Sequence, residues 1–490
     1  MLDWLAAQTA ARPDGVALVI GEAEYTYADL NARVDAACAR LTALGVTPGM
    51  MVALLLPSRL ETVVLIHALA RLGAVLLALN TRLTAAEIDY QLEMAGCDLL
   101  ICARNTEAAA AELKRQPLRI VTLDQPQTSR AEAWDAIPPR ANWQPAPCDL
   151  ERVQGVLFTS GTTGTPKGAQ MTFANHFWSA MASAYRIGTL PDDRWLCPMP
   201  LYHVGGLAII LRCCLYGTTV VLQNGFQLDA IDRALDTQPI SLMSVVPTML
   251  YRLLKARESF PPSLRLILLG GAAASTDLLE RCHERGLPVA TTYGLTETAT
   301  QVATMLPDDA RRKPGSVGKP LLYTTVRIVD ERGYSLPPGA PGEIVVSGKT
   351  VMRGYLHQQP TNGEIKTGDI GFLDEDGDLW LMDRRSDLIV SGGENIYPSE
   401  VESVLRSHPA VADACVVGVP DAEWGQRVAA LVALRAGMDV SESTLIAYSR
   451  ERLAGYKQPR LIRFIDRLPQ TASGKIHRRA VLDTFLSSPT

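Results

Sequence analysis

The sequence predicts an α/β fold: a large N-terminal domain of α/β layers that includes a small β-rich subdomain, followed by a C-terminal α+β domain. Three observations predict this organisation. Strand-like and helix-like segments alternate up to residue 285, which indicates layers around a mainly parallel sheet. From residue 318 the strand-like runs become short and are separated by Gly and Pro turns, and the last ~100 residues form a domain-sized set of their own. The predicted domains are therefore 1–384, with the subdomain at about 318–384, and 385–490.

The first part of the chain, before a Pro-rich stretch at 137–147, contains two kinds of segment. Continuous apolar runs, typical of strands buried on both faces, lie at 52–56, 74–79 and 99–102. Segments with helical periodicity lie at 28–44, 60–72 and 85–95, and an Ala/Glu-rich patch at 103–115 predicts a surface helix.

The same alternation returns further along the chain. Helices are predicted at 173–186, 205–215, 228–236, 247–256 and 276–285, and strands at 218–222, 240–245 and 264–269. The β-rich part has strand-like runs at 325–329, 342–347 and 377–382. The C-terminal domain combines helices at 399–407 and 442–453 with strands at 411–419, 427–434 and 461–464.

Composition excludes several classes of protein. With 490 residues, 47% of them hydrophobic and 20% charged, the chain is typical of a soluble multidomain enzyme. A net charge of −5 gives no indication of a nucleic-acid surface. We expect no membrane span and no signal peptide. Nine cysteines without a Cys-x-x-Cys pair favour a reducing, cytoplasmic location.

The strongest motif is a loop of hydroxyl, glycine and lysine residues that follows an apolar run at 153–158. Glycines allow backbone N–H groups to form an anion nest, hydroxyls add donors, and lysine adds a positive charge. The sequence therefore predicts a triphosphate-binding loop rather than a flexible linker. It is not a Walker A motif, because Gly168 follows the lysine. Its candidate nucleotide-binding residues are Thr159, Ser160, Gly161, Thr162, Thr163 and Lys167.

Further polar motifs follow in the chain, and each taken alone could be an ordinary turn. In the segment 292–298 an aromatic ring beside glycine can stack on a purine, and the carboxylate of Glu297 can bind Mg²⁺, which prefers oxygen ligands. In the segment 367–371, Asp369 can accept hydrogen bonds from ribose hydroxyls. The Ser-Gly-Lys turn that contains Lys475 would normally be solvated.

Together, five motifs in a fixed order over 159–476 resemble the adenylate-forming superfamily, which includes acyl-CoA synthetases, peptide-synthetase adenylation domains and luciferases. The resemblance implies ATP, Mg²⁺ and coenzyme A as cofactors and co-substrates. It implies that Glu297 and Thr162 hold Mg²⁺, that Tyr293 packs on adenine, and that Lys475 and Glu297 are catalytic. Further nucleotide contacts that it implies are Gly271, Ala272, Thr292, Gly294, Thr296, Asp369 and Arg384. Gly392 and Gly393 resemble the loop of the thioester-forming step, and the resemblance implies that the C-terminal α+β domain is mobile.

The segment 200–206 carries no acid that could pair with an amino group, so it resembles the acyl-CoA synthetase branch of the superfamily. The predicted function is an ATP-dependent carboxylate–CoA ligase that forms an acyl-adenylate and then a thioester. Segments at 172–180, 193–196, 216–222 and 384–398 resemble a branch that acts on a dicarboxylic aromatic acid. His203, which is also a catalytic candidate, joins Gly270, Thr300 and Gln301 as a candidate substrate contact; a core histidine is the alternative for His203.

Other functions remain open at this point. The chain could be a CoA ligase for an aryl, malonyl or medium-chain acid, a stand-alone adenylation module that loads a carrier protein, or a non-enzymatic nucleotide-binding relative. The expected partners are a small carboxylic acid, ATP and coenzyme A, without nucleic acid, and a homodimer is possible.

Overall fold

The structure is a computed structural model that describes residues 3–147, 149–159, 166–272, 274–383, 388–469 and 476–486. The chain divides into two compact units. The large unit comprises Met1–Thr81, Leu92–Phe158 and Gly168–Met382, and the small unit comprises Arg82–Gln91, Thr159–Lys167 and Asp383–Thr490. The predicted boundary between residues 384 and 385 lies outside the described residues and stays a prediction.

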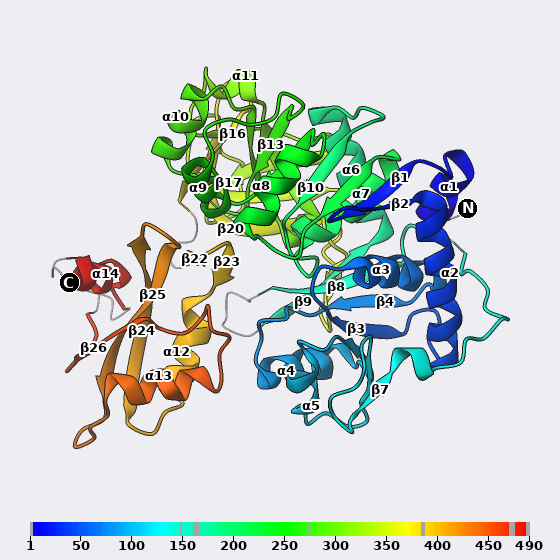
Figure 1. Cartoon of the computed structure of the whole chain (residues 1–490). Coiled ribbons are helices and arrows are strands. Elements are labelled where there is room, and N and C mark those ends of the chain that lie inside the picture. Colours follow the sequence, from blue (N-terminus) through cyan, green and yellow to red (C-terminus); the bar gives the residue numbers. More distant parts are fainter. Residues whose placement is uncertain are drawn as a thin grey trace. The chain divides into compact units, whose positions relative to one another are not determined.

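The first sheet of the large unit has the strand order β19-β9-β8-β4-β3-β5-β6-β7 (Figure 1). Its strands are β3 (Met51–Leu55), β4 (Val75–Ala78), β5 (Leu99–Cys102), β6 (Arg119–Thr122), β7 (Ala131–Ala133), β8 (Val153–Thr159), β9 (Lys167–Thr172) and β19 (Gly354–Tyr355). The helices of this part are α1 (Trp4–Ala11), α2 (Tyr27–Ala43), α3 (Leu60–Leu72), α5 (Glu107–Ala111) and η1 (Trp134–Ala136). Helix α4 (Ala85–Ala95) is divided, since its residues up to Gln91 belong to the small unit. The pairs from β8 through β7 are parallel, and β19 pairs with β9 in the antiparallel sense.

The second sheet has the order β17-β18-β20-β21-β16-β15-β14-β13-β12-β10-β11-β1-β2. Its strands up to β14 are β1 (Val16–Ile20), β2 (Ala23–Thr26), β10 (Arg194–Cys197), β11 (Thr219–Leu222), β12 (Leu242–Val245), β13 (Leu266–Leu269) and β14 (Val289–Leu295). The remaining strands are β15 (Thr300–Met305), β16 (Ser316–Pro320), β17 (Thr324–Val329), β18 (Gly342–Gly348), β20 (Glu364–Leu373) and β21 (Leu379–Asp383). The strands of the β-rich segment are thus joined to the α/β part through β16, which pairs with both β15 and β21.

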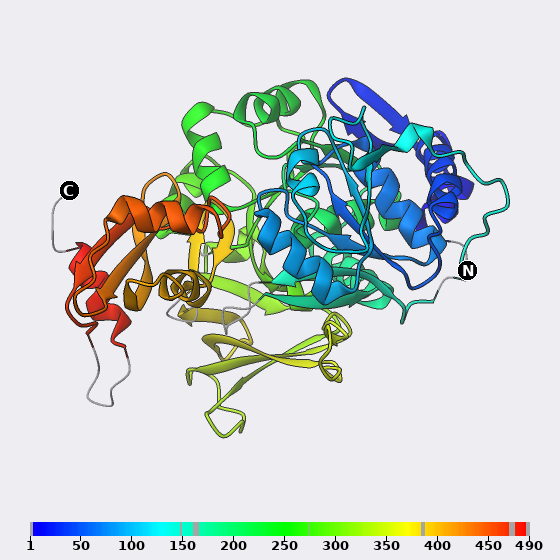
Figure 2. The same ribbon diagram turned by 90° about the horizontal axis from the view of Figure 1, so that it is seen from below.

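Alternating side chains place two different cores on the two faces of this second sheet. On one face, residues such as Trp195 and Val220 belong to a core that also contains residues of β3, β4, α2, α3 and α7 (Val204–Tyr216). On the other face, neighbours such as Leu196 and Val221 pack with α8 (Leu228–Thr237), α9 (Pro247–Ala256) and α10 (Thr276–Glu284). Because successive strand residues point to opposite faces, a layer of helices covers each side of the strands (Figures 1 and 2).

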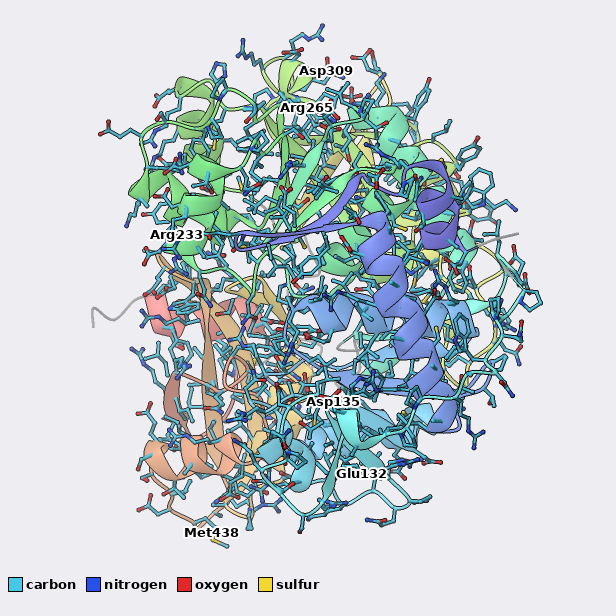
Figure 3. The ribbon with its side chains drawn as sticks, turned by 45° about the vertical axis from the view of Figure 1, so that its right-hand side comes forward. Glu132, Asp135, Arg233, Arg265, Asp309 and Met438 are labelled. Carbon is cyan, nitrogen blue, oxygen red and sulfur yellow. The ribbon has the colours of Figure 1, made fainter. Side chains whose placement is uncertain are left out.

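Polar side chains fix the ends of several elements. The N-terminus of α6 (Phe173–Ile187) has a capping box between Thr172 and Asn175, which satisfies two backbone N–H groups. Asp193 is 2% exposed and pairs with Arg265, which Figure 3 labels, and it accepts a further hydrogen bond from Ser241 at 2.7 Å. These three residues precede β10, β13 and β12, so one carboxylate ties together the starts of three parallel strands.

The small unit contains a sheet with the order β23-β22-β25-β24, and β26 pairs with β25. Its strands are β22 (Ile389–Ser391), β23 (Glu394–Ile396), β24 (Val411–Asp421), β25 (Gly425–Leu434) and β26 (Leu461–Ile465). One face packs on α12 (Pro398–Arg406) and α13 (Glu442–Arg450), and the other packs on α14 (Arg478–Leu486).

The predicted α/β class and the α+β character of the C-terminal part are confirmed, and most helices begin within a residue or two of their predicted positions. The predicted surface helix at 103–115 is wrong. Only Glu107–Ala111 is helical, and Glu107 is buried because its carboxylate accepts hydrogen bonds from the backbone N–H groups of Gln127 and Thr128 at 2.7 Å each.

Two other properties follow from the described residues. None of their helices is apolar over the length that a bilayer crossing needs. The eight cysteines among them are all buried and unpaired with one another.

Candidate functional site

The phosphate-loop motif connects two neighbouring strands of the first sheet. Thr159 is the last residue of β8, and Lys167 is the first residue of β9. The predicted residues Ser160, Gly161, Thr162 and Thr163 lie outside the described residues. A Cβ at Gly168 would lie 2.7 Å from a methyl group of Leu356, so the chain that leaves the loop passes close to the segment after β19.

The second and third nucleotide motifs meet through one hydrogen bond. Tyr293, at 2% exposure, donates from its hydroxyl to the Oδ2 atom of Asp369 at 2.6 Å. The backbone N–H of Asp369 in turn donates to Thr367 Oγ1 at 3.1 Å. Residues that are 76 positions apart therefore form one buried polar group, which holds the predicted ribose-binding carboxylate in place. The predicted contact of Tyr293 with adenine stays a prediction.

Glu297 lies in the short η2 helix (Thr296–Thr298), directly after β14. Its side chain accepts a hydrogen bond from Tyr355 Oη to Oε1 at 2.8 Å, and its carbonyl accepts one from the N–H of Met352 at 2.8 Å. The half-buried carboxylate belongs to the class of oxygen ligand that Mg²⁺ prefers, so Glu297 fits the predicted metal ligand.

The turn after Glu297 has an unusual backbone. Ala299 and Thr300 have φ values of 50° and 98°, in the region that favours glycine. A Cβ at Gly294 would lie 1.7 Å from the carbonyl oxygen of Thr300, so only glycine fits opposite this turn. Ser179 of α6 donates to the carbonyl of Ala299 at 2.6 Å, and the guanidinium of Arg212 donates to the hydroxyls of both Ser179 and Thr300.

Arg212 is a buried cation with hydroxyl partners. It is 3% exposed, and no ion pair to it is formed among the described residues. Burial lowers the pKa of Arg212. Burial, with the charge of Arg212 as a further cause, lowers the pKa of the neighbouring His176 to about 3, so this imidazole is neutral at physiological pH.

The predicted substrate contacts have different degrees of exposure. Gln301 is 2% exposed, and its amide donates to Thr304 Oγ1 at 2.9 Å. Thr300 is half-buried and faces Arg212, as described above. His203 is half-buried at the N-cap of α7, with its ring edge-on to Tyr202 at 4.7 Å between centroids.

The glycine-rich segment after β13 is closely packed. A Cβ at Gly270 would lie 2.6 Å from Cγ2 of Thr292, and Gly271 has a φ of +79°. Thr292 itself donates to the carbonyl of Ala303 at 2.9 Å. The predicted neighbours Gly270, Gly271 and Thr292 therefore lie together, and Ala272 follows them directly in the chain.

The predicted residues of the C-terminal part are divided. Gly392 and Gly393 form the two-residue turn between β22 and β23, with φ values of 60° and 86° that suit a hairpin of this length. The N–H of Gly392 donates to the carbonyl of Trp424 at 2.9 Å. Arg384 and Lys475 lie outside the described residues.

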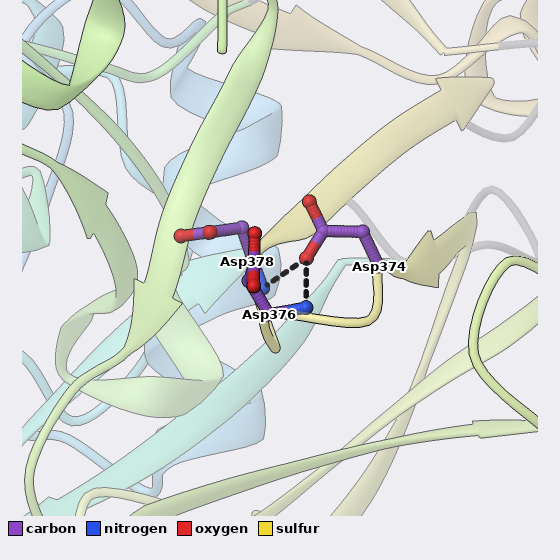
Figure 4. Close-up of side chains that lie close together, drawn as sticks. All are labelled: Asp374, Asp376 and Asp378. Atoms are coloured by element: carbon purple, nitrogen blue, oxygen red, sulfur yellow. Dashed lines mark hydrogen bonds between the residues drawn. The ribbon is translucent and has the colours of Figure 1, made fainter. Parts of the chain in front are cut away.

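In the part of the chain that the structure describes, one group of carboxylates is close enough to share a metal ion: Asp374, Asp376 and Asp378 (Figure 4). An ammonium already occupies their centre. Lys313 Nζ lies 2.7, 2.7 and 2.6 Å from the three carboxylates. Lys313 thus takes the place that an ion would need among these carboxylates, and Glu297 is the better candidate for a metal ligand.

The AMP-binding enzyme family matches residues 5–356, and the AMP-binding enzyme C-terminal domain matches residues 400–475. The chain belongs to the AMP-binding, adenylate-forming enzyme family. The predicted superfamily is thus confirmed.

More specific similarities extend over the whole chain. It is 42% identical to the 2-succinylbenzoate–CoA ligase of Bacillus licheniformis, over 97% of this chain and 98% of the relative. It also resembles o-succinylbenzoate CoA synthetase of Bacillus subtilis. A double mutant of that enzyme bound with a product analogue gives a TM-score of 0.91 at 38% identity, covering 99% and 98% of the two chains. The same enzyme in complex with its acyl-adenylate intermediate gives 0.74 at 37% identity, covering 100% and 99%.

Sequence reasoning named Glu297, Tyr293 and Asp369, but it missed Tyr355, Ser179 and Arg212. Arg212 carried a usable signal, since it is a charge inside the apolar run Leu207–Cys214. Tyr355 carried no local signal, because its partner lies 58 residues away.

Proposed function

We propose that this chain is a 2-succinylbenzoate–CoA ligase, which uses ATP to convert 2-succinylbenzoate into 2-succinylbenzoyl-CoA for menaquinone biosynthesis. The observation that carries the proposal is the 42% identity to a 2-succinylbenzoate–CoA ligase over nearly the full length of both chains. The hydrogen bond between Tyr293 and Asp369 supports it, because it unites two nucleotide motifs in one buried group.

The reaction proceeds in two half-reactions. A carboxylate oxygen of the acid attacks the α-phosphorus of ATP, the bond to the bridging oxygen breaks, and pyrophosphate leaves with that oxygen. The sulfur of coenzyme A then attacks the acyl carbon, and AMP leaves with the electron pair of the cleaved bond. The protein contributes positioning and charge stabilisation, as phosphoryl transfer generally requires.

Individual residues have distinct proposed roles in the first half-reaction. Asp369 accepts hydrogen bonds from the ribose, and Tyr293 orients this carboxylate through the 2.6 Å bond. The 159–167 loop binds the β- and γ-phosphates with hydroxyls, backbone N–H groups and Lys167. Lys475 neutralises negative charge on the reacting carboxylate and α-phosphate.

Glu297 and Thr162 are the proposed holders of Mg²⁺. A Mg²⁺ ion held by these residues would supply positive charge that stabilises the negative charge of the phosphates. The task of the chain is to hold the Glu297 carboxylate in a fixed orientation, and the described contacts of Glu297 with Tyr355 and Met352 serve this purpose.

For the second half-reaction we propose that Gly392 and Gly393 let the pantetheine thiol approach, since a glycine turn presents backbone without side chains. His203, Gly270, Thr300 and Gln301 are the proposed contacts of the acid. The hydroxyl of Thr300 and the imidazole of His203 can hydrogen-bond the second carboxylate of 2-succinylbenzoate.

The decisive experiment compares 2-succinylbenzoate with benzoate, malonate and octanoate in ATP–pyrophosphate exchange, and then measures AMP release with and without coenzyme A. We expect exchange with 2-succinylbenzoate and AMP turnover that depends on coenzyme A. Exchange with another acid alone would favour a different small-acid ligase, and turnover that requires a carrier protein would favour an adenylation module.

A second test separates the half-reactions. Lys475→Ala should reduce adenylate formation strongly, by about 100-fold or more, and leave thioester formation from supplied acyl-adenylate almost unchanged. Equal losses in both steps would contradict the role of Lys475. A homodimer and a cytoplasmic location stay predictions, which light scattering and cell fractionation can check.

A further inference from the structure

The side chain of Glu297 is held by a residue that the sequence motifs did not include. Tyr355 Oη donates to Glu297 Oε1 at 2.8 Å, and Met352, three residues earlier, donates its backbone N–H to the carbonyl of Glu297 at 2.8 Å. One short segment therefore contacts both the main chain and the carboxylate of this residue.

The same segment is hydrogen-bonded to the strand that leaves the phosphate loop. In β19, Gly354 and Tyr355 pair with Gln170 and Ala169 of β9. The N–H of Leu356 donates to the carbonyl of Gly168 at 2.8 Å, and the N–H of Arg353 donates to that of Gln170 at 3.0 Å. Tyr355 thus lies on a strand whose register is fixed relative to β9.

The segment before β19 is also firmly anchored. Val351 and Met352 are 4% and 1% exposed. The buried amide of Asn175 donates to the carbonyls of Lys349 and Val351 at 3.0 and 2.8 Å, and Thr361 Oγ1 donates to the carbonyl of Met352 at 2.7 Å. A hydroxyl carried by such a support loses little entropy when it binds a neighbouring carboxylate.

We propose that Tyr355 is a positioning residue, which sets the orientation of the Glu297 carboxylate. The inference rests on the proposed role of Glu297 as a Mg²⁺ ligand. A glutamate has three rotatable side-chain bonds, and a hydrogen bond to a charged acceptor is among the stronger ones in proteins. Without the Tyr355 hydroxyl, the carboxylate would sample orientations unsuited to holding a metal ion.

The test uses Tyr355→Phe, which removes only the hydroxyl. The affinity for ATP is measured by titration calorimetry in the presence of Mg²⁺ and in the presence of EDTA. We expect the affinity in Mg²⁺ to fall about ten-fold, the lower end of the scale of one hydrogen bond to a charged group, whereas the affinity in EDTA stays within about two-fold. In pyrophosphate exchange, half-saturation should require a correspondingly higher Mg²⁺ concentration.

Two further variants make the result unambiguous. Tyr448→Phe removes a tyrosine hydroxyl that donates to the carbonyl of Ser407 in the small unit, and it should behave as the wild type in both titrations. Glu297→Gln should abolish the gain in affinity that Mg²⁺ gives. Thermal unfolding of each variant identifies any general loss of structure.

If Glu297→Gln loses the Mg²⁺-dependent gain in affinity but Tyr355→Phe retains it, the proposed role of Tyr355 is overturned while that of Glu297 stands. The role of Tyr355 is also overturned if Tyr355→Phe weakens ATP binding equally with and without Mg²⁺. If Glu297→Gln keeps the full gain, the proposed metal role of Glu297 fails, and the role of Tyr355 fails with it.

Discussion

Two loops of the large unit are each organised by one cation, and the two cations differ in their partners. Arg212 binds neutral hydroxyls, whereas Lys313 binds carboxylates. Arg212 is 3% exposed and donates to the hydroxyls of Ser179 and Thr300 beside the Glu297 turn. Lys313, whose side chain is 24% exposed, is surrounded by the carboxylates of three aspartates in the 374–378 loop.

The difference indicates what each cation is for. Moving a charge out of water without an opposite charge costs free energy, so burying Arg212 beside the turn lowers the stability of the folded protein. The Lys313 cluster avoids most of this cost because its charges stay near solvent. For the same reason its ion pairs contribute little to stability. We infer that Arg212 serves the geometry of the site, whereas Lys313 serves the local fold of a loop remote from it in sequence.

The largest expected effect comes from closing the space opposite the Glu297 turn. In Gly294→Ala the new Cβ would meet the carbonyl oxygen of Thr300 at 1.7 Å, so the turn must move. We expect a loss of more than about 3 kcal/mol in unfolding free energy, measured by chemical denaturation. Gly455→Ala, where no atom lies within 4 Å of the new Cβ, is the matched control and should change stability little.

Arg212→Met removes the buried charge beside the Glu297 turn. Methionine fills a similar volume without a buried charge, so we expect unfolding free energy to rise by about 1 kcal/mol while the rate of pyrophosphate exchange falls at least about tenfold. Thermal unfolding and exchange assays measure the two effects. A loss of both stability and activity would mean that Arg212 is a structural residue only.

His176, which lies near Arg212, should make the stability of the protein depend on pH. Its pKa in the folded protein is about 3, against 6.5 for an ordinary histidine, because it is buried and lies near Arg212. The unfolded chain therefore takes up a proton below pH 6.5 that the folded protein does not bind. Stability should fall in this range by up to about 1.4 kcal/mol per pH unit.

Denaturation at pH 7, 6 and 5 measures this slope. In His176→Gln the contribution should disappear, so the wild type should lose stability relative to the variant as the pH decreases. An unchanged slope in His176→Gln would show that other groups dominate.

The smallest effect is expected for Lys313→Met. Lys313 donates hydrogen bonds to Asp374, Asp376 and Asp378, and these bonds raise its pKa. Desolvation opposes the effect at Asp374, but Lys313 and Trp380 still lower the pKa of this carboxyl to about 2. The stabilisation should therefore be present between about pH 4 and pH 10. It should be lost as the pH falls through 2 or rises through the raised pKa of Lys313.

We expect the melting temperature of Lys313→Met to fall by about 2 °C at pH 7 and to match that of the wild type near pH 2. Thermal scans at the two pH values measure this difference. A larger loss at pH 7 than that of Gly294→Ala would reverse the proposed order of the two loops.

Much of the α/β part could be predicted from the sequence. The helix Leu60–Leu72 and the strand Leu99–Cys102 have their predicted bounds, since continuous apolar residues between turn signals define them locally. The strand pair β14–β15 could not be predicted. Its threonine-rich sequence alternates weakly, and its turn uses left-handed conformations at Ala299 and Thr300, which only the surrounding side chains stabilise.

For the candidate site, too, local motifs could be predicted from the sequence but long-range contacts could not. Motifs located Glu297 and Asp369, because each carries its chemistry within a few residues. The hydroxyls that orient these carboxylates come from Tyr355 and Tyr293, which lie 58 and 76 residues away from them in the chain. Such partners depend on how the sheets are joined, and no local pattern encodes this.

The core between the two sheets of the large unit also bears on how the protein opens. Residues of β3 and β4 share one continuous apolar layer with residues of β10 and β11, and helices α2, α3 and α7 contribute to it. Neither sheet can separate from this layer without exposing the other. Amide hydrogen exchange in the central strands of both sheets should therefore occur through one common opening event, with similar protection on either side.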